Sequence, residues 1–342
     1  MDFSPDEGQQ AVADVVTSVL ERDNTWDGLV AGGVTALGVP ERLGGDGVGL
    51  AEIATALTEI GRHGTVSPAL VTLAATAVLL DLASEAQQDR YLDGVGKGSV
   101  VTVALNEPGA ALPEQPSVTL AAGKLNGTKT GVGYAAQADW IVVTAGGGVV
   151  VVPGDADGLT VTKTPTSNGS DEYVLTFVDV AVADADLLDG ATPHRANQLV
   201  LASVGAFAAG LVAGALRLTA DYVATREQFG RPLSTFQTVA VQLSEVYIAS
   251  RTISLLSTSV VWLLSEGLDA EDDLAILGYW LTSQAAPAMR LCHHLHGGMG
   301  MDITYPMDRY YSSIKDLTRL LGGPSHRLDL VGAGLGERSD GK

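Results

Sequence analysis

The spacing of apolar residues along the chain predicts two helical parts with a strand-rich part between them. From residue 9 to residue 21 the apolar side chains recur at intervals of three and four, as in an amphipathic helix. Similar spacing continues through the first 99 residues and returns after residue 196. The helices that it predicts cover 9–21, 50–62, 67–82, 197–224, 236–266, 270–296 and 306–320.

Between residue 100 and about residue 186 the pattern changes to short runs of β-branched residues. Gly146-Gly147-Gly148 separates two of these runs and predicts a hairpin turn. It is not a phosphate-binding loop, because no helix follows it. Short strands at this spacing are typical of a small antiparallel sandwich or barrel. The predicted strands cover 100–105, 140–144, 149–152 and 173–182.

Together these elements predict an α+β fold that is mainly α. We expect an N-terminal helical domain over residues 1–99, a middle antiparallel β-domain over 100–190 and a C-terminal helical bundle over 191–342. The sequence shows no repeat, low-complexity tract or evident linker, so the three parts are expected to pack as one body. A chain of 342 residues is long enough to bury an extensive core.

The charge balance excludes one class of partner. The chain has 40 acidic and 20 basic residues, a formal net charge of −20, and no run of lysine or arginine, so it repels nucleic-acid phosphates. Its single cysteine, Cys292, leaves no disulfide framework and no cysteine-rich zinc site. The first residues lack the basic and apolar regions of a signal peptide. We therefore expect a cytoplasmic protein without a nucleic-acid partner.

One apolar segment raises the question of a membrane span. Residues 199–216 carry no charge, and a segment of that length reaches the lower limit for a spanning helix. Gly and Ala make up much of it, and the helical pattern continues through Arg217, Asp221 and Arg226. We interpret the segment as a central helix buried on all sides and expect no membrane span.

Cys292, His293, His294 and His296 are clustered, as ligands are in some metal sites. Their spacing distributes them around a helix instead of along one face, and no second group of ligands elsewhere in the sequence completes a site. We therefore expect no metal.

The densest chemical signal lies where one long helix is predicted to end and the next to begin. Residues 226–233 contain Arg226, Phe229 and a glycine, and Phe236-Gln237 opens the next helix. A guanidinium can bind a phosphate through two parallel hydrogen bonds, and an aromatic ring beside it can lie against a flat ligand ring. Judged by its chemistry alone, a turn whose arginine is paired within the chain is the more common interpretation.

This corner closely resembles the corresponding segment of the acyl-CoA dehydrogenase family, and further segments resemble that family in the family's order. They are Leu-Gly-Val-Pro-Glu (37–41), Leu-Gly-Gly-Asp-Gly (43–47), Asn-Glu-Pro-Gly (106–109), Leu-Asn-Gly-Thr-Lys (125–129), Phe-Val-Asp-Val-Ala-Val (177–182), His-Gly-Gly-Met-Gly-Met (296–301) and Tyr-Pro-Met-Asp-Arg (305–309). Each is weak alone, but their order and spacing over nearly the whole chain are specific. The resemblance implies an N-terminal helical domain, a middle β-domain and a C-terminal four-helix bundle.

The resemblance also implies a cofactor and a reaction. Members of the family bind FAD; a carboxylate removes the α-proton of an acyl-CoA thioester while N5 of the flavin takes a hydride from the β-carbon. Each FAD lies across a contact between two subunits, and the corner of one subunit holds the ADP part of its neighbour's flavin. The residues here that match this ADP-binding half are Arg226, Gln228, Phe229, Gly230, Phe236, Gln237, Gly297 and Gly298, with His294 in the place of a usual glutamine. The histidine can still make one hydrogen bond.

The sequence departs from the family at both positions of the catalytic base. The usual Tyr-Glu-Gly-Thr segment falls on residues 320–323, so Leu321 occupies the position of the glutamate, and an alkyl group cannot accept a proton. Some relatives carry the base near the start of the helix that leads to the corner; that position falls on Val200, with no carboxylate beside it. Glu245 is a conceivable substitute base, although an acidic residue there more often pairs two helices or faces water.

The flavin-ring half of the family's site is also altered. The family has Gly-Ser-Asp shortly after Thr-Glu-Pro, but here residues 106–109 are followed by Ala-Ala-Leu-Pro, without a serine. The family's Trp-Ile-Thr, which backs the isoalloxazine ring, falls on Gly131-Val132-Gly133. An aromatic wall and a hydroxyl donor are thus replaced by two glycines and a valine.

One half of a shared site is retained and the other half is lost, so we interpret the chain as a non-catalytic, FAD-supporting subunit of a heteromeric acyl-CoA dehydrogenase. A homologous catalytic partner in an α2β2 assembly would supply the base, the ring pocket and the acyl-CoA site. The chain resembles the short, degenerate subunit of actinobacterial enzymes of this type that act in steroid side-chain degradation; the steroid substrate rests on that resemblance alone. Two alternatives stay open: a self-sufficient homo-oligomer with a displaced base, and a non-redox scaffold that has lost the cofactor.

Overall fold

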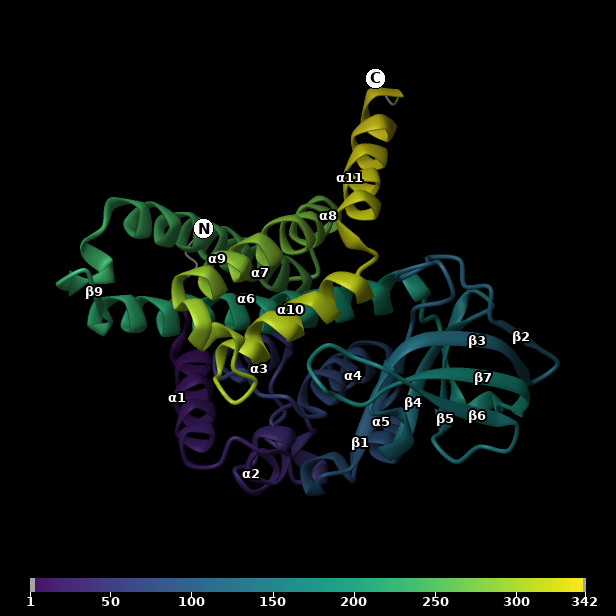
Figure 1. Cartoon of the computed structure of the whole chain (residues 1–342). Helices are drawn as coiled ribbons and strands as arrows, with labels where there is room; N and C mark the ends of the chain where they lie inside the picture. The colour runs from purple at the N-terminus through teal and green to yellow at the C-terminus, as the bar shows by residue number, and fades with distance from the viewer. Residues whose placement is uncertain (1–3, 341–342) are drawn as a thin grey trace. The chain divides into compact units, whose positions relative to one another are not determined.

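The computed structural model describes residues 4–340, with side chains described up to residue 334. The chain folds into two compact units. The first consists of residues 5–57 and 67–204, and the second consists mainly of residues 58–66 together with the chain from residue 205 onward. Figure 1 traces the chain through its helices and strands. The three-domain division with boundaries at residues 99 and 190 stays a prediction.

The predicted N-terminal helices are present, with ends close to those expected. They are α1 (Glu7–Arg22), α3 (Leu50–Arg62) and α4 (Ala69–Leu82). α1 begins where Asp6 and Gln9 cap each other, each side chain accepting the other's backbone N–H. The sequence did not predict α2 (Trp26–Ala31) and α5 (Glu85–Leu92), because six and eight residues are too few to show a helical period.

The strands of the first unit form two four-stranded sheets. One has the order β1 (Val100–Ala104), β4 (Ala138–Ala145), β5 (Gly148–Pro153), β8 (Leu187–Leu188). The other has the order β2 (Thr119–Ala121), β3 (Lys124–Gly133), β7 (Glu172–Ala181), β6 (Leu159–Thr164). Gly146 and Gly147 join β4 to β5 with positive φ, so the predicted hairpin turn is confirmed.

One pairing corrects the expectation of a purely antiparallel β-domain. β1 and β4 run parallel, with Val101 opposite Trp140 and Val103 opposite Val142. A parallel pair needs a long connection, and the chain between these two strands provides one by forming β2 and β3 in the other sheet. Strands β2, β6 and β8 were not predicted, because they are short or largely exposed.

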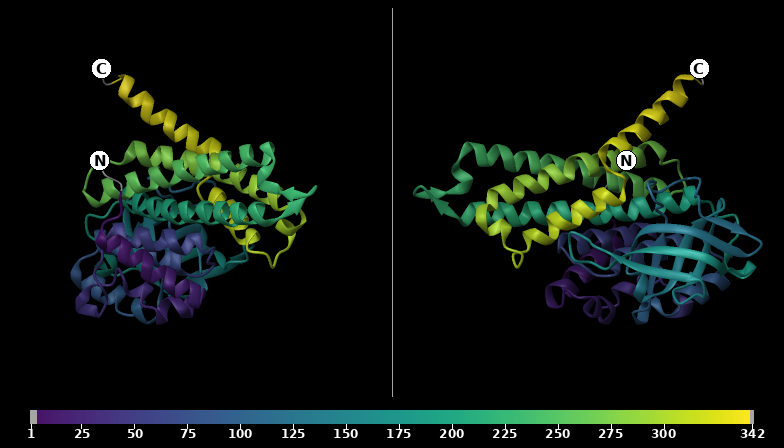
Figure 2. Two further views of the ribbon diagram at one scale, coloured as in Figure 1. Left: turned by 90° about the vertical axis from the view of Figure 1, so that its left-hand side faces the viewer. Right: turned by 45° about the vertical axis from the view of Figure 1, so that its right-hand side comes forward.

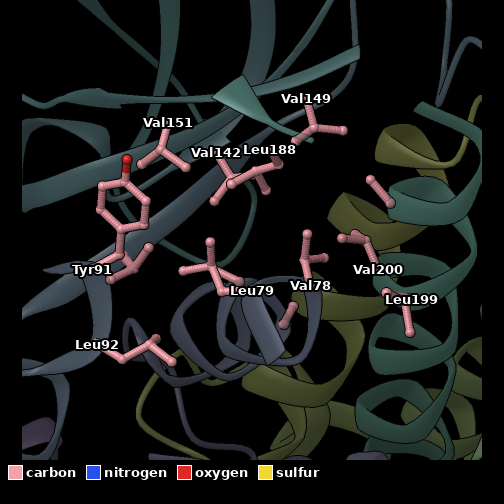
Figure 3. Packing of buried hydrophobic residues seen from close by; sticks show 14 of the residues in the cluster. Val78, Leu79, Tyr91, Leu92, Val142, Val149, Val151, Leu188, Leu199 and Val200 are labelled. Carbon is pink, nitrogen blue, oxygen red and sulfur yellow. The ribbon is translucent and has the colours of Figure 1, made fainter. Parts of the chain in front are cut away.

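β4 and β5 are buried on both faces. One face contributes Ile141 and Val143 to an apolar cluster shared with the second sheet. The other face contributes Val142 and Val151 to a cluster with α4, α5 and the start of α6 (Pro193–Thr225), as Figure 3 shows. Strands covered on both sides consist of continuous apolar runs instead of alternating ones, which accounts for the valine-rich sequences of β4 and β5.

The second unit is a bundle of long helices, as predicted. Its helices are the later part of α6, α7 (Gln237–Ser265), α8 (Glu271–Trp280), α9 (Ala286–His296), α10 (Met307–Leu320) and α11 (Gly323–Asp340). A π-helical turn, Leu281–Ala285, joins α8 and α9 into one continuous helical rod. This rod, α6, α7 and α10 are the four members of the expected four-helix bundle, and α11 is an additional helix. The sequence did not predict α11. Gly322 and Gly323 both have positive φ and turn the chain, so that α11 leads away from α10 (Figure 2).

Close backbone packing explains the glycine-rich run at residues 199–216. A Cβ at Gly210 would overlap the carbonyl oxygen of Thr58 in α3, and one at Gly214 would overlap that of Arg62. In the other direction, a Cβ at Gly61 would overlap the carbonyl oxygen of Phe207. Two helix backbones approach this closely only where neither presents a side chain.

Among the described residues, α6 and α7 are long and apolar enough to cross a membrane. The apolar window of α6 is 83% buried, so its interpretation as a buried central helix is confirmed, whereas that of α7 is 39% buried. Core helices of globular proteins meet the same criteria of length and composition, so the two helices are weak evidence for a membrane span.

A buried ion pair joins β3 to the loop that follows β1. Lys129 is 0% exposed, and its Nζ donates to Glu107 Oε1 at 2.8 Å, to Leu105 O at 3.0 Å and to Thr144 Oγ1 at 3.0 Å. The other carboxylate oxygen of Glu107 accepts from the N–H and the hydroxyl of Ser117. Burial alone would raise the pKa of Glu107, but the hydrogen bonds from Lys129 and Ser117 outweigh it and hold that pKa at about 2.

We predict that Lys129→Met destabilises the protein by about 3–5 kcal/mol, because it leaves a buried carboxylate without its cation. In the parent protein the ionised Glu107 stabilises the fold above the ordinary pKa of 4.5, and this contribution is lost as the pH falls towards about 2. Urea unfolding at neutral pH and in acid measures both effects.

The matched control is Lys163→Met. Lys163 pairs with Asp171, but its side chain is 66% exposed, so its loss should leave the unfolding midpoint unchanged. Equal destabilisation by the two substitutions would show that the buried pair has no special role.

Candidate functional site

The predicted corner forms a two-stranded ribbon at the end of α6. β9 (Glu227–Gln228) pairs with β10 (Arg231–Pro232) in antiparallel register. Phe229 and Gly230 form the turn between them, with φ of 52° and 77°, the geometry of a type I′ turn. Because Phe229 is not glycine, its left-handed backbone costs about 1–3 kcal/mol.

The ribbon holds an aromatic ring in solvent. Phe229 is 90% exposed and meets Phe236 edge-on at a centroid distance of 6.1 Å. Arg231 lies over Phe236, with its Cζ 4.0 Å from the ring centroid. A large exposed ring on a strained turn contributes little to a fold, and strained residues of this kind cluster at ligand sites.

Arg226 provides an exposed cation at the same corner. Its N–H donates to Tyr222 O at 2.8 Å and its carbonyl accepts from Leu233 N at 2.9 Å, which fixes where the ribbon begins. Among the side chains that the structure describes, which end at residue 334, its guanidinium has no ion-pair or hydrogen-bond partner. α7 then starts at Gln237 with no side-chain cap from the described residues, so its first N–H groups are free to bind an anion.

A second exposed surface lies at the end of α9. Gly297 has φ 57° and ψ −134°, a combination that is strained for any residue with a Cβ. Gly297 and Gly298 are exposed, and nothing within 4 Å would meet a Cβ at either position. Two bare peptide units are therefore open to close approach by a ligand. His294, near the end of the helix, is exposed as well.

The structure brings the glycine pair to the corner. The ring of Tyr222, one turn before Arg226, stacks on the ring of His296 at a centroid distance of 4.5 Å and an interplanar angle of 24°. The Tyr222 hydroxyl donates to the backbone carbonyl of His296 at 3.4 Å. The residues predicted to hold the ADP part of FAD thus lie on two neighbouring segments of the second unit, 226–237 and 294–298. What they bind stays a prediction.

Sequence reasoning missed the role of Tyr222 and His296 as this link. A tyrosine at helical spacing in an apolar helix predicts ordinary core packing, and His296 stood out as a possible metal ligand and as the first residue of a segment resembling the family, without a contact to Tyr222. Among the residues that the structure describes, no group of three or more His, Cys, Asp or Glu side chains could hold a metal ion. The positions of the two residues in the sequence could have indicated this link, because Tyr222 lies one helical turn before Arg226 and His296 directly precedes Gly297.

Comparison with known proteins decides the family. A model of the acyl-CoA dehydrogenase C-terminal domain matches residues 202–333, and a model of the acyl-CoA dehydrogenase N-terminal domain matches residues 3–99. Acyl-CoA dehydrogenase FadE28 of Mycobacterium tuberculosis is 70% identical to this chain over 97% of the chain and 98% of its own length. The chain belongs to the acyl-CoA dehydrogenase family.

Two solved structures match nearly the whole fold. They are the ChsE4-ChsE5 complex from Mycobacterium tuberculosis and a variant of the Tcur3481-Tcur3483 steroid ACAD. In each case the TM-score is 0.90 at 29% identity, over 98% of this chain and 99% of the matched chain. The expected fold, with N-terminal helices, a middle β-domain and C-terminal helices, is confirmed. Members of the family use FAD.

Neither position predicted for the acyl-CoA dehydrogenase base carries a carboxylate. Leu321 is 3% exposed at the end of α10, and its carbonyl accepts from Arg327 Nε at 2.8 Å. Val200 is 7% exposed and lies with Val78 in the apolar cluster of the first unit (Figure 3). A carboxylate at position 200 would be buried among alkyl groups, which is costly for a charge. Glu245 is exposed on α7.

The segment in the place of the family's Gly-Ser-Asp is closed by its own contacts. Leu112 has φ 50°; its N–H donates to Asn106 Oδ1 at 2.8 Å, and its carbonyl accepts from Asn197 Nδ2 at 2.9 Å. Its side chain packs against the apolar cluster that contains Val200. A leucine held in this way gives the segment no hydroxyl to offer a flavin.

The strand in the place of Trp-Ile-Thr has little room for those side chains. Gly131 has φ 66°, at an irregularity in the pairing of β3 with β7. A Cβ at Gly133 would lie 2.9 Å from Val71 Cγ1 in α4. The left-handed backbone at Gly131 and the close approach of α4 to Gly133 therefore disfavour larger side chains, such as those that back a flavin ring in other members of the family.

We predict that Gly297→Ala lowers the melting temperature, by an amount equivalent to about 1–3 kcal/mol, because its backbone conformation is strained for alanine. Gly298→Ala is the matched control and should melt with the parent, because its φ is not positive and nothing crowds a Cβ there. Scanning calorimetry of the two variants decides the point. An equal loss in both would show that the backbone conformation of Gly297 is not the cause.

Proposed function

We propose that this chain is the non-catalytic, FAD-supporting subunit of a heteromeric acyl-CoA dehydrogenase. The observation that carries the proposal is the contrast between two groups of positions. The corner at Arg226 and the turn at Gly297-Gly298 are exposed, whereas both base positions are filled by the buried side chains of Leu321 and Val200. We propose that a homologous partner supplies the base, the flavin-ring pocket and the acyl-CoA site, in an α2β2 assembly.

The exposed half fits the ADP part of a FAD molecule whose ring lies in the partner. The residues proposed to hold it are Arg226, Gln228, Phe229, Phe236, Gln237, His294, Gly297 and Gly298. The guanidinium and the free N–H groups of α7 suit a diphosphate, and the phenylalanine rings suit the adenine. The amides and the imidazole offer hydrogen bonds, and the glycines admit a close backbone contact. FAD, when bound, accepts the hydride from the β-carbon of the acyl thioester.

The similarity to heteromeric relatives supports a partner chain. The ChsE4-ChsE5 complex and the Tcur3481-Tcur3483 steroid ACAD each pair two differently named proteins. By analogy we propose a steroid side-chain CoA ester as the substrate in the partner's site, and a cytoplasmic location. The net charge of −20 favours this arrangement, because an acidic surface repels the phosphates of CoA.

The first experiment compares the chain purified alone with the chain purified together with a homologous partner that carries the glutamate and Trp-Ile-Thr. Flavin absorbance and acyl-CoA oxidation are measured in both preparations. We expect flavin and turnover only in the co-purified complex. Turnover by the chain alone would overturn the non-catalytic role, and a complex without flavin would favour a non-redox scaffold.

We predict that Arg226→Ala weakens FAD binding by the complex by roughly 10- to 100-fold, the range expected for loss of a charge-assisted hydrogen bond of about 1.5–3 kcal/mol. FAD released during gel filtration at increasing dilution measures the effect. Arg22→Ala, at an exposed arginine in α1 of the first unit, is the control and should release no more FAD than the parent. Unchanged FAD retention in Arg226→Ala would contradict the role of the corner.

We predict that Leu321→Met leaves turnover of the complex within about twofold of the parent, because it conserves volume in a buried site that takes no part in proton transfer. Leu321→Ala should cost about 2–5 kcal/mol of stability through the cavity it creates, again with little change in turnover below the melting transition. Steady-state assays paired with thermal melts separate the two effects. A collapse of turnover in either folded complex would mean that this segment belongs to a working site.

A further inference from the structure

Tyr222 and His296 form the direct contact between the corner and the glycine turn. They are 74 residues apart in sequence, yet their rings stack at 4.5 Å, and Tyr222 also holds the carbonyl that immediately precedes the Gly297 peptide. Movement of either ring would therefore displace the turn relative to Arg226. Under the function proposed above, these two segments bind the same ADP moiety. The distance between them therefore affects the affinity for FAD.

A hydrogen bond fixes the tautomer of His296. Its Nδ1 lies 2.8 Å from the carbonyl oxygen of Cys292, which can only accept, so Nδ1 carries the proton and Nε2 is a bare acceptor. His296 is 2% exposed, and its Nε2 has no hydrogen-bond partner among the described residues. The position is therefore built for a neutral imidazole.

The groups packed around His296 offer no counter-charge. Tyr222 faces it from α6, Tyr305 faces it from the segment before α10 at a centroid distance of 5.3 Å, and Cys292 and His293 belong to α9 itself. None of these is a carboxylate. Burial lowers the pKa of His296 and outweighs the hydrogen bond to the carbonyl of Cys292, which raises it; the neighbouring His293 lowers it further. Attraction between an imidazolium and the Tyr222 ring would offset only part of the cost of burying an unpaired charge.

We propose that Tyr222 and His296 are positioning residues of the shared FAD site, and that their stacked, neutral pair holds the Gly297-Gly298 turn against the Arg226 corner. Protonation of His296 weakens its stacking on Tyr222 and, as a result, weakens the binding of ADP. This inference rests on the proposed function.

The sign of the pH dependence follows from linkage. The arrangement that binds ADP needs the neutral ring, and burial holds the pKa of His296 below its ordinary value of about 6.5. FAD affinity is therefore unchanged between about pH 7.5 and about pH 6.5. It falls only at a lower pH, where the buried ring takes up a proton.

The test measures the FAD dissociation constant of the co-purified complex at about pH 7.5 and at about pH 5. His296→Phe keeps an aromatic face for Tyr222 but cannot be protonated, so its affinity should not change between the two pH values. His294→Gln removes the exposed histidine nearby and should keep the parent's relative fall in affinity at the lower pH. Tyr222→Leu, which loses the stack, should weaken FAD binding at both pH values, and Tyr222→Phe should weaken it less.

The outcomes separate this inference from the function on which it rests. If Arg226→Ala releases FAD but His296→Phe keeps the parent's pH dependence, the positioning role is wrong and the proposed function stands. If neither Arg226→Ala nor His296→Phe changes FAD binding, the proposed function is wrong, and this inference is wrong with it. A second measurement uses the parent protein without FAD, so it does not depend on whether the variants fold. Nitrogen NMR of this protein should show His296 as a neutral Nδ1–H tautomer at about pH 6.5. A freely titrating His296 would overturn the inference.

Discussion

The packing of the α6 backbone against the end of α3 is the constraint on which the candidate site depends. Gly61, Gly210 and Gly214 let the two helices meet with no side chain between them, so α6 cannot rotate or slide without a clash of main-chain atoms. Tyr222 lies further along the same helix and Arg226 directly follows its last residue, so the packing of α6 fixes the position of both. The abundance of glycine in this run, which at first raises the question of a membrane span, is thus a condition for placing the corner.

The two ends of α6 lie in different environments, and the departures from the family follow that difference. Near its start, Val200 joins an apolar cluster and Asn197 donates a hydrogen bond to Leu112 O. The residues at the predicted positions of a base and of a flavin-facing serine are therefore buried or hydrogen-bonded within the chain. At its end, Arg226 and the ribbon remain in solvent. Unpaired polar groups persist at little cost only in water, and there they stay available to a second molecule.

The sequence predicted those features that depend on local periodicity. The long helices and the β4–β5 hairpin were found because their spacing and glycines act within a few residues. The parallel pairing of β1 with β4 was missed because it depends on the path of the chain between them, and α11 was missed because its start is marked by Gly322-Gly323 instead of an apolar period. The corner residues came from a resemblance to known proteins. The Tyr222–His296 contact has no counterpart in local spacing, because it joins residues 74 positions apart.

Backbone strain gives an independent reason to regard the corner as part of a larger assembly. Phe229 keeps a left-handed backbone where glycine would be relaxed, and its ring is 90% exposed, so within the chain it combines a conformational cost with little burial. Local rules of sequence and structure are typically broken at functional sites, where a gain elsewhere compensates. For Phe229 that gain would come from a flat ligand or a partner surface covering the ring. Under the proposed function a shared FAD would supply the first and a homologous subunit the second, so one proposal accounts for the strained turn, the exposed arginine and the exposed glycines together.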